Sequence, residues 1–390
     1  MFTITTFQAV LKGISRPVFD QCVDRLHADK YCKQFNHWNH LVAMVYAQLS
    51  NASSLRTLEL SFNSHASFHY QFGSGAVHRS TLSDANKARS GVVFDDTAAW
   101  LISQLSGKLR REAMGLMYLL DSTSITLKGR QFDRWTLTSR TCHTQGLKLH
   151  VLLDAANRIP EWYSFSAANV NDVVQANRVP LQPGALYVFD KGYCDYNWWN
   201  RIDAAGALFV TRFKGNAALL VEEKCSIPAP LWGTVVEDEI VRFKRKYPSG
   251  KRINQYDKPL RRIVIERPDK STPLVLATND LESSPAEIAQ RYKERWGIEL
   301  FFKWIKQHLK IKQFFGRSPN AVHNQIVTAL ISYLLVALYK QAHGLLHTLW
   351  GCLSLISSTL FQPAITETVP RRKRLRRPPD VTRALWEPGL

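Results

Sequence analysis

The stretch that decides the fold is residues 284–313, which read SPAEIAQRYKERWGIELFFKWIKQHLKIKQ. Ser284, Pro285 and Glu287 have the pattern of a helix start: a capping serine, proline at the first helical position and glutamate at the third. Gly297 is the one helix-disfavouring residue in the roughly 25 residues that follow, so the stretch predicts a single long helix.

Four polar residues of this helix share one face. At about 100° per residue, Tyr292, Arg295, Glu299 and Lys306 fall within about 60° of one another. Most of the remaining circumference is apolar, which is typical of a buried helix. A buried helix with one polar stripe directs that stripe at a polar site. The alternative is a solvent-facing surface carrying ordinary glutamate–lysine pairs.

Two buried strands upstream each run into an acid. The apolar run 116–120 is followed by Asp121, and the run 185–189 is followed by Asp190. A carboxylate at the exit of a buried strand is costly unless it has a partner or a function. Gly115 to Lys214 therefore predicts a mixed α/β sheet with two carboxylates at strand ends.

The composition narrows the class of partner. The chain has 390 residues and a net charge of +19, which favours a polyanion: nucleic acid first, an anionic membrane surface second. No basic amphipathic helix with an aromatic face supports the membrane alternative. The six cysteines include no CxxC pair, which fits a reducing cytosol, and residues 326–339 have the length of a core helix.

The pattern divides the chain into three parts. Residues 1–112 predict a small all-α domain, 113–344 a catalytic α/β domain with a basic β-rich insertion at 215–281, and 345–390 a helix with a basic, disordered tail. Short helices with basic and amide side chains can place one helix in a DNA groove, or can simply form a solvated helical domain. His37 and His40 are expected at the surface rather than as metal ligands.

Three carboxylates in a basic protein suggest a two-metal site. Asp121, Asp190 and Glu299 supply the oxygen ligands that Mg²⁺ prefers. Two such ions can activate a water or a 3′-hydroxyl and stabilise the leaving oxygen of a phosphodiester.

These residues also carry a resemblance. Asp121-Ser122-Thr123, Asp190-Lys191-Gly192-Tyr193 and the spacing Tyr292-x2-Arg295-x3-Glu299-x6-Lys306 resemble the DDE transposases of bacterial insertion sequences. The match is to the branch with a Tyr-Arg-Glu-Lys signature, which is insertion-sequence-four-like. Residues 6–109 resemble the N-terminal domain often found on these transposases.

The resemblance implies a ribonuclease-H-like core in which Asp121, Asp190 and Glu299 bind two Mg²⁺ ions, with Mn²⁺ as a substitute. It implies cleavage at the ends of an insertion sequence and strand transfer into target DNA, with or without a hairpin intermediate. Tyr292, Arg295 and Lys306 would hold phosphates, and Lys191 and Tyr193 are further candidates for DNA contact. It also implies a homodimer on double-stranded DNA, in the bacterial cytoplasm near the nucleoid and not at a membrane.

Two other functions stay open at this point. A metal-dependent DNA nuclease would use the same acids, and a transposase-derived DNA-binding protein could have lost activity elsewhere. Asp195 and Asp154 are weaker candidates near the site, and Glu294 lies off the polar stripe of the helix.

Overall fold

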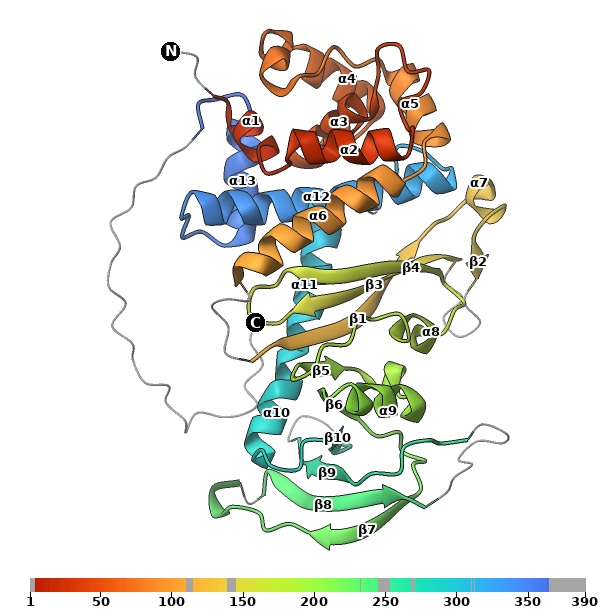
Figure 1. The fold of residues 1–390 in the computed structure, drawn as a ribbon, viewed down its shortest axis with the longest axis vertical. Helices are drawn as coiled ribbons and strands as arrows, with labels where there is room; N and C mark the ends of the chain where they lie inside the picture. Colours follow the sequence, from red (N-terminus) through yellow and green to blue (C-terminus); the bar gives the residue numbers. More distant parts are fainter. Residues whose placement is uncertain are drawn as a thin grey trace.

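A computed structural model describes residues 4–109, 115–138, 145–231, 233–244, 253–267, 271–309, 311 and 313–364. A helical bundle lies at one end of the molecule, a mixed sheet crosses the middle, and the strands of the insertion form the other end (Figure 1). The basic stretch 371–377 of the tail predicted to be disordered lies outside the described residues.

The central strands are β1 (Met117–Thr126), β3 (Gln145–Asp154), β4 (Pro160–Ala167), β5 (Leu186–Phe189) and β6 (Leu208–Arg212). Their order is β4-β3-β1-β5-β6; β3 is antiparallel to β1 and β4, whereas β1, β5 and β6 are mutually parallel. Strand β2 (Leu137–Thr138) also pairs with β3. This antiparallel-then-parallel order is the ribonuclease-H-like arrangement, and it confirms the predicted fold class.

The insertion continues the same sheet. It contains β7 (Leu219–Lys224), β8 (Val235–Phe243), β9 (Leu260–Ile265) and β10 (Leu274–Thr278). Strand β10 pairs antiparallel with β6, and β9, β8 and β7 follow in order, so that ten described strands form one sheet. The sequence predicted a β-rich insertion here but did not indicate that its strands would join the core sheet.

Some of the basic residues of the insertion are neutralised by acids. The guanidinium of Arg261 donates to both carboxylate oxygens of Asp238 at 2.8 and 2.7 Å, and both side chains are buried. Arg262 pairs with Glu237 and Glu239. The basic residues expected at 245, 246, 251 and 252 lie outside the described residues.

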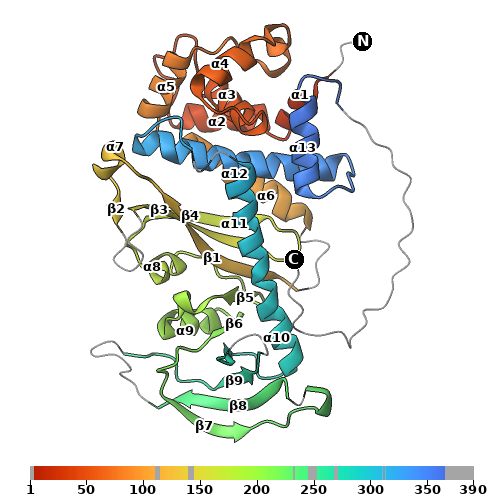
Figure 2. The ribbon, with the colours of Figure 1, turned by 180° about the vertical axis from the view of Figure 1, so that it is seen from behind.

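The stretch that decides the fold forms two helices in line, α10 (Pro285–Glu294) and α11 (Trp296–His308), which run along the back of the sheet (Figure 2). The predicted capping box between Ser284 and Glu287 is present. The prediction of one uninterrupted helix is wrong at Arg295, where hydrogen bonds from Arg295 to Tyr292 and from Ile298 to Arg295 span three residues instead of four.

Gly297 lies beside this junction for a steric reason. A Cβ atom there would lie 1.2 Å from Nη1 of Arg158, which comes from the turn between β3 and β4. Glycine therefore lets the arginine cross the helix, where it pairs with Glu294 at 3.3 Å. The junction between α10 and α11 is thus packed against the β3–β4 turn.

The bundle is built around a helix from the other end of the chain. Helix α12 (Pro319–Ala342) packs against α1, α3, α5 and α6, and α13 (Leu349–Thr359) packs against α1 and α3. The surrounding elements are α1 (Thr6–Leu11), α2 (Arg16–Arg25), α3 (His37–Leu49), α4 (Leu55–Asn63), the short 3₁₀ helix η1 (Ala66–Phe72), α5 (Arg79–Ala88) and α6 (Val92–Leu109).

Helix α12 is long and apolar enough to cross a membrane by length and composition, with a mean hydropathy of 1.6, but 89% of that window is buried inside the protein. This is the environment of a core helix, as its sequence predicted. In contrast, His37 and His40 are not at the surface as expected. Both are buried, because α3 is enclosed by the bundle on nearly all sides.

Candidate active site

Three parallel strands bring three charged residues side by side. Leu120 pairs with Phe189, so the next residues, Asp121 and Asp190, are neighbours across β1 and β5. Val188 pairs with Val210, so Asp190 and Arg212 are neighbours across β5 and β6 in the same way. Side chains that follow matched positions on parallel strands lie at one edge of the sheet.

The sequence suggested that strand β1 ends at Asp121, but the strand continues beyond this residue. Its parallel pairing with β5 stops at Leu120, but its antiparallel pairing with β3 continues to Thr126. Asp121 therefore lies in the middle of a strand and is held on one side by Val151 of β3. This gives the carboxylate a more rigid base than a loop would give.

The helical junction supplies the other side of the site. Arg295 donates to Glu299 at 2.5 Å and lies 3.5 Å from Asp121, so one guanidinium bridges a strand and α11. The hydroxyl of Tyr292 donates to Asp190 at 3.4 Å, and Arg212 forms an ion pair with the same carboxylate. The three predicted acids, Tyr292 and Arg295 thus converge on one place.

The electrostatics of the acids differ. Burial raises the pKa of Asp121 to about 6. The charges of Asp190 and Glu299 also raise this pKa, whereas the charge of Arg295 lowers it. Burial also acts to raise the pKa of Asp190, but the hydrogen bond and charge of Arg212 outweigh it, and the pKa is lowered. The site therefore concentrates negative charge that two arginines partly neutralise.

The donor set fits hard divalent cations. Asp121, Asp190 and Glu299 are carboxylates, and carboxylate oxygens are the ligands that Mg²⁺ and Mn²⁺ prefer. Arg295 lies between Asp121 and Glu299, and Arg212 is paired with Asp190. Within the part of the chain that the structure describes, no group of three acid, histidine or cysteine side chains is positioned to hold a metal ion. Metal ligation would therefore exchange guanidinium partners for a cation at the same oxygens.

The remaining predicted site residues occupy different environments. Lys306 lies two turns beyond Glu299 on α11, and Lys191 is exposed directly after Asp190. Tyr193, in contrast, is 1% exposed, with its hydroxyl 3.4 Å from Nδ1 of His150. Its hydroxyl is enclosed, so this placement does not support the predicted DNA contact; the ring packs edge-on against that of Phe189.

Arg212 belongs to the site although it was not among the residues predicted from sequence. A signal was present, because Arg212 is the first charged residue after the apolar run 207–210, as Asp121 and Asp190 are after theirs. A cation that follows the neighbouring strand is therefore as informative about this site as the acids that follow the other two.

The weaker candidates have structural roles. Asp154 accepts hydrogen bonds from the backbone amides of Ala156 and Asn157 at 2.8 and 2.9 Å, and so closes the β3–β4 turn. Asp195 caps α9 (Tyr196–Ala204) by accepting from Asn197 and Trp198 at 3.0 Å. Glu294 pairs with Arg158.

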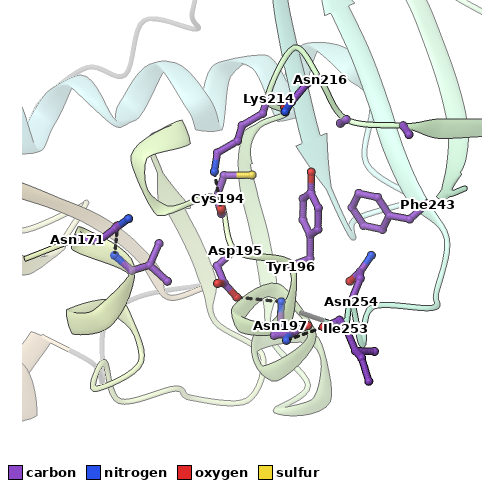
Figure 3. Close-up of a pocket in the computed structure, with 13 residues that line it drawn as sticks. Asn171, Cys194, Asp195, Tyr196, Asn197, Lys214, Asn216, Phe243, Ile253 and Asn254 are labelled. Atoms are coloured by element: carbon purple, nitrogen blue, oxygen red, sulfur yellow. Dashed lines mark hydrogen bonds between the residues drawn. The ribbon is translucent and has the colours of Figure 1, made fainter. Parts of the chain in front are cut away.

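A polar cavity of about 300 Å³ adjoins the Asp190 loop (Figure 3). Lys214, which follows β6, donates to the backbone carbonyl of Cys194 at 3.2 Å on its wall. The rings of Tyr196 and Phe243 lie 4.1 Å apart and join α9 to the end of β8. The cavity therefore lies where the core sheet meets its extension.

Comparison with known proteins places the chain in a family. Residues 115–335 match the family model described as the transposase DDE domain, and residues 3–74 match a domain of unknown function, DUF4372. The chain is 37% identical over 303 residues to the Sinorhizobium fredii protein y4zB, which is named as a transposase; the match covers 76% of this chain and 82% of that protein.

Two more relatives are named as transposases of insertion sequence elements. The IS5377 protein of Geobacillus stearothermophilus is 28% identical, over 69% of this chain and 70% of its own length. The IS4SA protein of Synechocystis is 27% identical, over 67% and 72%. A cryo-EM structure of the piggyBac transposase synaptic complex with hairpin DNA has a TM-score of 0.48 and 11% identity, covering 92% of this chain and 80% of that one. The match of more than half of the chain to the DDE domain, together with the 37% identity to the Sinorhizobium fredii protein, shows that this protein belongs to the DDE transposase family of insertion sequences.

Proposed function

We propose that Asp121, Asp190 and Glu299 hold two Mg²⁺ ions, for which Mn²⁺ can substitute, and that this site performs the cleavage and strand transfer of the transposase. The observation that carries the proposal is the register of β1 and β5, which makes Asp121 and Asp190 neighbours opposite Glu299 of α11. When bound, the ions would activate the attacking oxygen and stabilise the leaving oxygen of the phosphodiester.

The other residues of the site would act on the DNA strand. Arg295 already reaches two of the carboxylates, so its guanidinium can clamp a phosphate beside them in a two-pronged manner. The hydroxyl of Tyr292 can donate to the same phosphate. Burial raises the pKa of Tyr292 to about 12, which keeps this donor protonated at neutral pH. Lys306 and Lys191 would contact phosphates farther along the strand.

The proposal extends to assembly and location. Two copies of the chain would pair two transposon ends as a homodimer, since strand transfer joins both ends of an element to one target. The protein would act in the bacterial cytoplasm at the nucleoid, where its DNA lies. The net charge of +19 suits this partner, because neutralising phosphates releases counterions and drives association.

The test is cleavage and joining of a labelled transposon-end duplex in Mg²⁺ by the wild type and by Glu299→Gln. We expect the variant to bind the duplex as the wild type does and to lose more than about a hundredfold in both reactions, because even the loss of an outer partner of a metal ligand costs ten- to a hundredfold. Glu294→Gln, on the same pair of helices but paired with Arg158, is the matched control and should remain active.

Other outcomes identify the alternatives. A wild type that cuts without joining would be a metal-dependent nuclease. A wild type that binds verified ends and performs neither reaction would be a DNA-binding protein derived from a transposase. Full activity of Glu299→Gln would remove Glu299 from the site.

A further inference from the structure

Tyr31 has a backbone conformation and a side-chain exposure that are both unfavourable for a tyrosine. Its φ of +68° lies in the left-handed region, which residues with a Cβ atom avoid and asparagine or glycine tolerate. Its side chain is 89% exposed, so the ring gains nothing from burial. Folding alone does not account for a tyrosine at this position, and strain of this kind is typical of functional sites.

The segment that carries Tyr31, residues 26–36 between α2 and α3, is firmly anchored. Asp29 accepts a hydrogen bond from the backbone amide of His37 at 2.9 Å and lies 2.6 Å from its ring Nδ1. At its far end, Arg89 donates to the carbonyls of Phe35 and Asn36 and stacks over the ring of Phe35. Because Arg89 directly follows α5, this 26–36 segment is fixed beside that helix.

Two lysines make the exposed surface of the segment basic. Lys30 lies 5.2 Å above the Tyr31 ring, and Lys33 is also exposed. Asp29, the acid between them and α3, is already engaged with His37. The segment therefore presents two ammonium groups and one phenol hydroxyl, which are all donors suited to phosphate oxygens.

Helix α5 presents a polar face next to this segment. Its buried side is Leu82, Ala85 and Asn86, and the bond between Asn86 and His40 of α3, 2.8 Å long, fixes how the helix is rotated. The other side consists of donors, acceptors and one alanine: Arg79, Ser80, Thr81, Ser83, Asp84, Lys87 and Ala88. An α-helix is about 10–12 Å wide, which fits the roughly 12 Å major groove of B-DNA.

We propose that the N-terminal bundle reads the ends of the element with this surface: α5 lies in the major groove, and the 26–36 segment holds the adjacent backbone through Lys30, Tyr31 and Lys33. Arg79, Ser80 and Thr81 face the base edges. This assigns sequence recognition to the part of the chain that matches the domain of unknown function, extended to α5. It rests on the protein being a DNA transposase and not on the assignment of the carboxylates.

The experiment measures binding of the full-length protein in EDTA, where no cleavage occurs. The probes are a fluorescent duplex carrying one terminus of the element that encodes the chain and a shuffled duplex of the same composition, each titrated at several salt concentrations. Tyr31→Asn relieves the backbone strain, so its melting temperature should not fall. Its affinity for the end should drop at least about tenfold, the effect of losing one hydrogen bond to a charged group.

Two further variants separate backbone contact from base reading. Lys30→Gln combined with Lys33→Gln should weaken both duplexes alike and lower the slope of log affinity against log salt by about 2. Arg79→Gln should weaken the end duplex about tenfold and the shuffled duplex much less. Lys12→Gln, at the end of α1 on the opposite side of the bundle (Figure 1), and Tyr70→Ala, another exposed aromatic, are the controls.

The inference is overturned if Tyr31→Asn folds and binds the end as the wild type does, or if Arg79→Gln weakens both duplexes equally. A wild type that does not prefer the end duplex would overturn it as well. Glu299→Gln separates the two proposals, because it should bind normally here whether or not it cleaves. Normal binding by all of the surface variants, with cleavage lost in Glu299→Gln, would reject this surface and leave the active site standing.

Discussion

The helical bundle and the carboxylate site both bury polar groups, but they satisfy them differently. Two buried groups of the bundle have neutral partners: His40 bonds Asn86 at 2.8 Å, and Gln325 bonds the backbone of Phe315 and Gln313 at 2.9 Å each. In the site, burial raises the pKa of Asp121, and the charges of Asp190 and Glu299 add to this effect. The backbone hydrogen bond from Ser122 and the charge of Arg295 offset only part of it.

The difference separates what serves stability from what serves chemistry. Buried polar groups that are paired with neutral partners fix a unique packing at little cost. Like charges held together in a half-buried place lower stability, and such places are typical of functional sites. Substitutions in the bundle should therefore lower the stability of the protein, whereas removing a charge from the site should raise it.

The largest effect is expected in the core of the bundle. Leu334 of α12 is completely buried, so Leu334→Ala should reduce the free energy of unfolding by about 2–5 kcal/mol. The measurement is urea denaturation of the full chain followed by circular dichroism. A loss well below 1 kcal/mol would mean that α12 is not the centre of this core.

The pH dependence of the bundle should follow His40. Burial lowers its pKa to about 3, while the unfolded chain takes up a proton at His40 below about pH 6.5. Stability is therefore lost as the pH falls from 6.5 towards 3, by about 2 kcal/mol at pH 5. Denaturation at a series of pH values should show a shallower decline for His40→Gln than for the wild type. Equal slopes would show that His40 is not buried in its neutral form.

Removing a charge from the carboxylate site should stabilise the protein, in contrast to substitutions in the bundle. At pH 8 without metal, Asp121→Asn removes a buried charge and should raise the free energy of unfolding by about 1–3 kcal/mol. Asp154→Ala is the contrasting control, since this buried aspartate closes a turn and its loss should destabilise the protein. A lower melting temperature for Asp121→Asn would mean that Asp121 is a structural residue like Asp154.

The smallest effect concerns Arg212. Its guanidinium occupies an oxygen of Asp190 that a metal ion would need, so Arg212→Gln should strengthen Mn²⁺ binding by the DNA-free protein. An ion pair of this exposure contributes about 1 kcal/mol at most, which limits the gain to about fivefold. Calorimetric titration would measure it, and weaker binding would instead make Arg212 a support for the ligand geometry.

Much of the site was accessible from sequence because the signals are local. Ser284, Pro285 and Glu287 specify a helix start through bonds within one turn. Apolar runs that stop at Asp121 and Asp190 follow from the cost of burying a charge, and the Tyr292–Glu299 stripe follows from helical periodicity. Each of these depends on residues that are close along the chain.

Contacts between distant residues were decided only by the tertiary structure. The register of β5 and β6 places Arg212 against Asp190. Antiparallel pairing with β3 extends β1 beyond Asp121, and pairing of β10 with β6 joins the insertion to the core sheet. Beside the helix junction at Arg295, the chain packs against Arg158 of the β3–β4 turn. Enclosure by the bundle buries His37 and His40. A sequence determines which residues prefer a strand, a helix end or the interior, but hydrogen bonding between strands and packing between layers determine which of them meet.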